Sequence, residues 1–262
     1  MMSPMNTFFC VKETIPPGMG FSLFSSGHLI WLASIALVTV LAALLYRKSS
    51  DKTRFIIRLV ISILLLADEA VKQILLFSTG QFNWDYLPLH LCSINIFIVL
   101  IHVITGSRYV AEALFALCLP AAAAALLFCS WTMLPLLNLM TIHSFTVHAL
   151  LFMYPVLLLA GGFRPDVKKL VRIIPFLAIV LIVIQIINVS LGTSFFFING
   201  AGEGNPLSLL EDTFGRPWYL IPAFFLVVIL WCVMYSVSAF VFRRKGKKDN
   251  IPFLSYIFHM TM

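Results

Sequence analysis

Residues 170–191 read LVRIIPFLAIVLIVIQIINVSL, and Arg172 is the only charged residue among them. A continuous apolar run of about 18 residues or more is long enough to cross the hydrocarbon core of a bilayer as a helix. The run also lacks the alternation of apolar and polar residues that is typical of a membrane β-strand. It therefore predicts a membrane-spanning helix.

Runs of the same kind recur along the chain. Of its 262 residues, 61% are hydrophobic and 11% are charged, which is far from the composition of soluble domains. We predict seven spans, at residues 29–46, 55–77, 88–105, 109–129, 141–161, 170–191 and 217–242. The predicted fold class is all-α: a polytopic membrane protein with one domain of seven transmembrane helices at residues 28–242.

The distribution of basic residues predicts how these helices are oriented. With seven spans, the odd-numbered connections and the C-terminal tail lie on one side of the membrane. That side holds all of the 18 Lys and Arg residues except Lys12, Lys72 and Arg216. The positive-inside rule places it in the cytoplasm. We therefore predict a multi-pass protein of the cell membrane, with residues 1–27 as an extracytoplasmic N-terminal tail and residues 243–262 as a basic cytoplasmic tail. The basic charge marks topology, so nucleic acid is not an expected partner.

The sixth connection, residues 192–216, carries the signals of a short helix. Asn205 can cap it, Pro206 suits its first position and Gly215 can end it. The helix predicted over residues 207–214 would lie on the outer surface. The segment from Glu203 onward could then act as a lid over a cavity that opens outward.

Two segments place reactive side chains at the ends of predicted spans. Residues 87–93 read LPLHLCS, and residues 143–148 read HSFTVH. The predicted topology puts His90, Cys92, His143 and His148 at one outer level of the membrane. Because such side chains are costly at membrane depth, they indicate a candidate catalytic site.

Cys92 falls in the first turn of its predicted helix, which makes it a candidate nucleophile. The helix N-terminus favours the thiolate, and its free N–H groups can stabilise an oxyanion. His90 and Cys92 are about 200° apart around an ideal helix, so we do not expect them to face each other. His143 or His148 is then the expected base. The alternative is that Cys92 fills space in the core and that His90 is a hydrogen-bonded structural residue.

Other polar residues fall in the outer halves of the spans. Asp68, Glu69 and Lys72 can form a self-compensating ion-pair cluster on one helix, or can orient a histidine. Asn95 shares a helix face with Cys92 and could orient a substrate carbonyl. The predicted substrate-binding residues are Asn95, Glu69, Lys72, Asn188, Arg216, Trp218 and Tyr219.

No metal site and no cofactor are expected. The side chains of His90, Cys92, His143 and His148 are of types that bind zinc. Their spacing, however, matches no compact zinc motif.

Three motifs together carry a resemblance to a known family. They are LPLHLCS at 87–93, HSFTVH at 143–148, and NPLSLL at 205–210 with GRPWYL at 215–220. Their order resembles the bacterial YwaF family, which is related to the eukaryotic transmembrane-protein-164 acyltransferases. The resemblance implies a seven-helix integral membrane protein. For the eukaryotic branch it also implies acyl transfer between phospholipids, with a cysteine matching Cys92 and an assisting histidine.

The sequence therefore predicts a membrane-embedded lipid acyltransferase or transacylase. It would move a fatty acyl group from a phospholipid to a lysophospholipid or similar acceptor through a Cys92 thioester at the outer leaflet. No cofactor is needed, because the donor is already an ester. The alternative is a non-enzymatic transporter or sensor, in which Asp68, Glu69, Lys72 and the histidines form a proton or ligand path.

Overall fold

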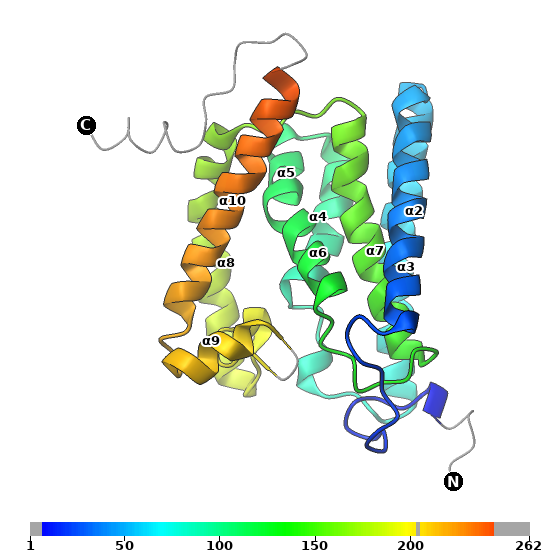
Figure 1. Cartoon of the computed structure of the whole chain (residues 1–262), viewed down its shortest axis with the longest axis vertical. Helices are drawn as coiled ribbons and strands as arrows, with labels where there is room; N and C mark the ends of the chain where they lie inside the picture. Colours follow the sequence, from blue (N-terminus) through cyan, green and yellow to red (C-terminus); the bar gives the residue numbers. More distant parts are fainter. Residues whose placement is uncertain (1–6, 203–204, 244–262) are drawn as a thin grey trace.

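The computed structural model describes residues 7–202 and 205–243, which fold into a bundle of long helices (Figure 1). The predicted spans one, two, three, five, six and seven each correspond to one continuous helix. These helices are α2 (Ser26–Lys48), α3 (Asp51–Ser78), α4 (Leu91–Thr105), α7 (Leu139–Ala160), α8 (Val167–Leu191) and α10 (Leu220–Arg243). The described residues form no strand, in agreement with the predicted all-α class.

The fourth predicted span is built from three consecutive pieces. It begins with α5 (Arg108–Ala113), continues through a π-helical turn, η2 (Leu114–Cys118), and ends with α6 (Leu119–Leu127). Pro120 stands in the first turn of α6. Proline has no N–H to donate to the preceding turn, and π-helical turns commonly absorb such a break.

The short helix predicted in the sixth connection is confirmed. Helix α9 spans Leu207–Phe214. The side chain of Asn205 accepts a hydrogen bond from the Leu207 N–H at 3.0 Å. Gly215 ends the helix with a positive φ of 70°, which glycine adopts without strain. Glu203, which we assigned to the lid, lies outside the described residues.

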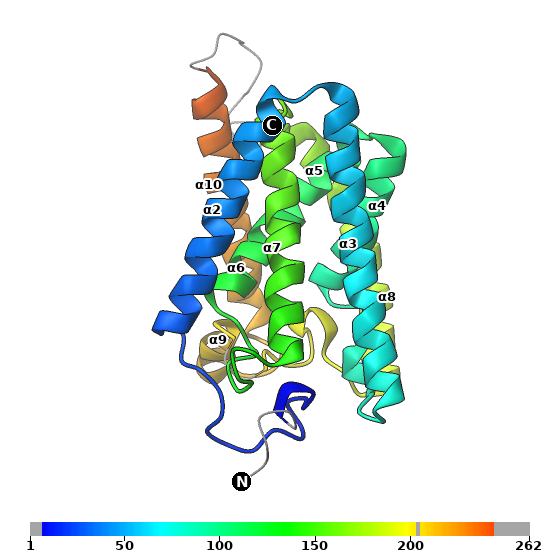
Figure 2. The same ribbon diagram turned by 90° about the vertical axis from the view of Figure 1, so that its right-hand side faces the viewer.

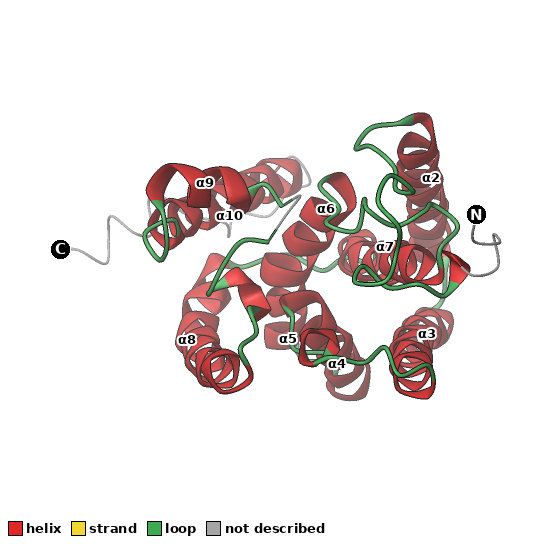
Figure 3. Cartoon of the chain, turned by 90° about the horizontal axis from the view of Figure 1, so that it is seen from below, coloured by secondary structure: helices red, strands yellow, loops and turns green. Residues whose placement is uncertain are grey.

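The two ends of the bundle carry different segments of the chain. One end carries α9, the N-terminal segment and the start of α4 and α7; we call it the α9 end (Figure 2). The other carries the α2–α3, α4–α5 and α7–α8 connections; we call it the basic end. Seen along the bundle, α4, α5 and α6 lie between the pair α8 and α10 and the group α2, α3 and α7 (Figure 3).

Six of the helical segments are long and apolar enough to cross a membrane. The second predicted span, α3, is not among them, because Arg58, Asp68, Glu69 and Lys72 interrupt its apolar sequence. Outward-facing apolar side chains are frequent on α2, α8 and α10, including Ile30, Phe176 and Phe224. Such side chains suit contact with lipid. The chain is therefore a membrane protein with several apolar spans.

The described part of the N-terminal segment begins at residue 7 and covers the α9 end. Asn138, the residue before α7, donates from its side chain to the carbonyls of Thr7 and Cys10, each at 2.8 Å. Glu13 accepts a hydrogen bond from the Tyr86 hydroxyl at 2.7 Å. These bonds attach the segment to the connections that lead into α7 and α4.

Candidate active site at the start of helix α4

The two polar residues that open α4 have different neighbours. His90 is the residue before the helix and has extended backbone angles, φ −65° and ψ 155°. Its ring lies against the rings of Phe195 and Phe197, with centroid distances of 5.2 and 5.3 Å. Cys92 instead packs against the apolar core of the bundle. His90 and Cys92 therefore point in different directions, as their spacing of two residues along a helix predicts.

Cys92 is half-buried and lies in the first turn of α4. Cys118 of η2 belongs to the apolar cluster against which Cys92 packs. Cys118 in turn donates to the Leu151 carbonyl of α7 at 3.3 Å. Within residues 7–202 and 205–243, no hydrogen bond joins Cys92 to a histidine.

The two histidines of α7 have different partners. The Nδ1 atom of His143 lies 2.7 Å from a carboxylate oxygen of Asp68 on α3, although the angle is not that of a hydrogen bond. The Nδ1 atom of His148 lies 2.6 Å from the Ser144 carbonyl. The ring of His148 also stacks on Trp131, with a centroid distance of 5.2 Å. The sequence allows Asp68 either to join an ion-pair cluster with Lys72 or to orient a histidine. The position of Asp68 beside His143 fits the second role.

Asn95 is the most unusual side chain of the site. It is 0% exposed, yet neither its amide nitrogen nor its amide oxygen has a hydrogen-bond partner among the described residues. Because Asn95 follows Cys92 by three positions on α4, the two residues share a face of the helix. A buried amide without partners costs free energy, so its presence needs a functional explanation.

Glu69 and Lys72 form the ion pair that their spacing predicts. Their charged atoms lie 2.7 Å apart, and the residues are 6% and 9% exposed. Gln73 donates to Glu69 at 2.8 Å and to the Tyr86 carbonyl at 2.7 Å. The charge of Lys72 acts on the His90 ring, which places the pair close to the candidate site.

The side chain of Asn188 forms hydrogen bonds with the loop that packs over His90. Its side chain accepts from the Phe195 N–H at 2.8 Å and from Thr193 at 3.0 Å, and it donates to the Phe195 carbonyl at 3.0 Å. These bonds fix η3 (Phe195–Phe197) at the end of α8. The described hydrogen bonds of the Asn188 side chain therefore hold the loop that forms the wall beside His90.

The remaining predicted substrate residues lie where α9 meets α10. Arg216 pairs with Glu211 of α9. The Ala201 N–H and then Arg216 hold the pKa of Glu211 below its ordinary value. Tyr219 is fully buried and donates to the Phe197 carbonyl, whereas Trp218 is 64% exposed. Tyr219 thus belongs to the wall, and Trp218 lies on the surface.

One buried carboxylate, that of Glu112, was not predicted from the sequence. Glu112 of α5 is 0% exposed and accepts hydrogen bonds from the Asp166 N–H and from the Tyr235 hydroxyl of α10. It joins α5, the α7–α8 connection and α10, away from Cys92. A single acidic residue within the span at 109–129 was the signal that could have revealed it.

Among the described residues, no group of three or more His, Cys, Asp or Glu side chains could hold a metal ion. The four residues considered for zinc are instead divided among different contacts. His90 packs on aromatic rings, Cys92 on the core, His143 beside Asp68, and His148 on Trp131.

Comparison with known proteins gives a relationship for the whole bundle. Neither the curated proteins nor the solved structures gave a match. The model of the TMEM164 family matches residues 23–235, a range that includes every described helix from α2 to α9 and most of α10. On this match, the chain belongs to the TMEM164 family.

Proposed function

We propose that this chain is a membrane-embedded lipid acyltransferase or transacylase whose nucleophile is Cys92. One observation carries the proposal: Cys92 shares a helix face with Asn95, a fully buried amide with no partner among the described residues. Membership of the TMEM164 family supports it, as does the resemblance of the three motifs to the YwaF family, which is related to the eukaryotic acyltransferases.

In the first step, the Cys92 thiolate attacks the carbonyl carbon of a phospholipid ester. A carbon–sulfur bond forms and the bond to the lysolipid oxygen breaks, so the lysolipid leaves with the proton that a base had taken from the thiol. In the second step, the hydroxyl of an acceptor lysophospholipid gives its proton to that base and attacks the thioester. The thiol of Cys92 is then restored, and no cofactor is consumed.

His148 is the better supported base. Leu151, one turn further along α7, accepts the hydrogen bond from Cys118, and both belong to the apolar cluster against which Cys92 packs. A carbonyl can only accept, so the bond to Ser144 requires the proton on Nδ1 of His148 and leaves a lone pair on Nε2. His143, with Asp68 beside it, would position the neighbouring groups.

Asn95 would act on the carbonyl that Cys92 attacks. Its amide nitrogen can donate to the oxygen as negative charge develops, together with the free N–H groups of the first turn of α4. The unpaired state of this amide is then explained, because its partner is the substrate. The loop that holds Phe195 and Phe197 over His90 would form the adjoining wall.

The proposal includes a topology. We infer seven spans, with α3 as the additional one, since it lies alongside α4 and α7 and reaches both ends of the bundle (Figure 2). The α9 end then faces the outside of the cell membrane and the basic end faces the cytoplasm. Residues 192–216 form a lid above the outer leaflet, and phospholipids and lysophospholipids are the partners.

The test is mass spectrometry of the purified full chain after incubation with a phospholipid. We expect a fatty acyl thioester on Cys92, and we expect Cys92→Ala and Cys92→Ser to abolish acyl transfer without loss of expression. Cys118→Ala is the matched control, because Cys118 is also a free thiol of the core, and it should retain transfer. Lipid remodelling that persists in purified Cys92→Ala would overturn the proposal. A transporter or sensor would form no acyl adduct at all.

A further inference from the structure

A polar cavity lies at the basic end of the bundle, remote from Cys92. It has a volume of about 380 Å³, and its lining includes Arg54, Arg58, Arg108 and His102. His102 follows Cys92 by ten positions on α4, so the two regions are roughly 15 Å apart along that helix. Nothing in the proposed acyl transfer uses this cavity.

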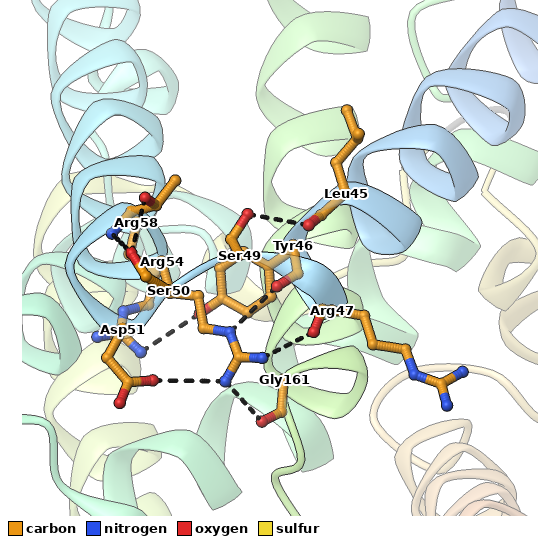
Figure 4. Close-up of polar contacts among 10 residues, drawn as sticks. Leu45, Tyr46, Arg47, Ser49, Ser50, Asp51, Arg54, Arg58 and Gly161 are labelled. Atoms are coloured by element: carbon orange, nitrogen blue, oxygen red, sulfur yellow. Dashed lines mark hydrogen bonds and ion pairs between the residues drawn. The ribbon is translucent and has the colours of Figure 1, made fainter.

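One of the arginines builds the cavity wall. Arg54 donates to the carbonyls of Tyr46 at 3.1 Å, Arg47 at 2.9 Å and Gly161 at 3.5 Å (Figure 4). The first two carbonyls belong to the end of α2 and the third follows the end of α7, where backbone carbonyls lack helical partners. Arg54 also pairs with Asp51 at 3.5 Å and lies over the ring of Tyr46, 5.6 Å from its centroid. Arg54 is thus fully engaged in holding three helices together.

Two other arginines keep free donors. Arg58 is half-buried, and its Nη1 donates to the Tyr46 hydroxyl at 3.3 Å. Its Nε is buried and has no hydrogen-bond partner among the described residues. Arg108 is exposed at the rim. In the described part of the chain, neither forms an ion pair with a carboxylate. Asp51 is the one acidic residue of the lining, and it already pairs with Arg54.

The cavity wall next to Arg58 is tightly packed. A Cβ atom on Gly161 would lie 2.7 Å from the ring of Tyr46, so only glycine allows α7 to end this close to α2. Tyr46 is 1% exposed as a result. His102 is held by the Tyr154 hydroxyl at 2.8 Å. Packed side chains therefore form the inner wall of the cavity.

We propose that this cavity binds a phosphate group. A half-buried guanidinium without a counter-charge is costly, and a bound anion removes that cost. Arginine presents its donors as a planar fork that matches phosphate oxygens. Two unpaired arginines suit the charge of a phosphate better than that of a single carboxylate. The volume is within the range of small-molecule sites and can hold a glycerophosphate.

The phosphate can come from a lipid headgroup or from a soluble phosphate ester, and two probes separate these sources. The full chain in detergent is titrated with glycerol 3-phosphate by calorimetry. In parallel, the chain is placed in nanodiscs of phosphatidylcholine with and without phosphatidic acid, and native mass spectrometry measures the retained lipid. Binding in the first arm identifies a soluble ester, and binding in the second arm alone identifies a headgroup.

Variants then locate the binding. Arg58→Gln should weaken it at least tenfold in whichever arm binds, and Arg108→Gln should weaken it several-fold. Arg108→Gln also keeps the test valid if Arg58→Gln fails to fold, because no described hydrogen bond or ion pair depends on Arg108. Arg47→Gln is the matched control: it removes the same charge at the same end, but its side chain is exposed and points away from the cavity (Figure 4). We expect it to change binding less than twofold.

Two outcomes would overturn this proposal. One is the absence of binding in both arms. The other is an equal loss in Arg47→Gln and Arg58→Gln, which would mean that general positive charge attracts the anion. Because the readout is binding, neither outcome depends on acyl transfer at Cys92.

Discussion

Cys92 and Asn95 lie on one face of α4, and their surroundings decide what each can do. Cys92 has the apolar core on one side and the free N–H groups of the first turn beside it. Asn95 is buried, and its amide has no hydrogen-bond partner among the described residues. If this amide only filled space, replacing it with an apolar side chain would stabilise the fold. The presence of the amide is better explained by a substrate.

The identity of the base can be tested at the same scale. We expect His148→Gln to lower the rate of thioester formation on Cys92 about a hundredfold or more, as for the loss of a general base. His143→Gln should lower it by about tenfold or less, because it removes only a positioning group. Single-turnover mass spectrometry of the adduct measures both rates. The reverse order of the two effects would assign the base to His143.

Helix α9 and the loop before it behave as one element. Glu211 of α9 accepts from the Ala201 N–H at 2.6 Å and pairs with Arg216. Asn188 and Tyr219 attach the preceding residues to α8 and α10. The proposed lid is therefore attached at its two ends, and Glu211 is the one titratable group among these described contacts that changes charge at acidic pH.

The stability of this element should depend on pH. Because the pKa of Glu211 is below its ordinary value of 4.5 in the folded state, its contribution is fully present above pH 4.5 and is lost as the pH falls through the lower folded pKa. The protection of residues 192–216 from hydrogen exchange, relative to the intrinsic rate at each pH, should therefore fall below pH 4.5. In Glu211→Gln, this protection should be low throughout and lack the pH dependence. An unchanged pH profile in the variant would contradict the assignment.

At the scale of the whole molecule, the bundle is held together by polar contacts as well as apolar packing. Glu112 joins α5 to α10 and to the α7–α8 connection, and Trp231 of α10 donates to the Ala116 carbonyl at 2.8 Å. These bonds matter because α8 and α10 bury little of their surface within the protein. In lipid, such helices gain no hydrophobic driving force from contact with one another.

Replacing Glu112 should therefore loosen the α8 and α10 side of the bundle. Glu112→Ala leaves the Asp166 N–H and the Tyr235 hydroxyl without this acceptor, and we expect a loss of about 3 kcal/mol in the free energy of unfolding. Tyr235→Phe removes one of these bonds and should cost about 1 kcal/mol. Unfolding in detergent by added denaturant measures both. A Glu112→Ala variant as stable as the unmodified chain would show that the clamp contributes nothing.

The number of spans is also a property of the whole molecule. If α3 crosses the membrane, Lys48, which ends α2 just before α3, and Ser78, the last residue of α3, lie on opposite sides. In intact cells, a membrane-impermeant maleimide should label Ser78→Cys and should label Lys48→Cys only after permeabilisation; both positions are exposed. The unmodified chain, with its five native cysteines, gives the background. Labelling of both variants from the same side would exclude α3 as a span.

The sequence by itself determined the helices, since the length of an apolar run and the capping residues Asn205 and Gly215 are local properties. It also determined that His90 and Cys92 point apart, which follows from helical periodicity alone. Only the tertiary structure decided the unpaired state of Asn95, the contact of His143 with Asp68, the clamp at Glu112 and the cavity around Arg58. In spans that are apolar on all sides, the pattern does not say which face meets a neighbouring helix. Contacts between residues far apart in the chain depend on that choice, and only the packed bundle makes it.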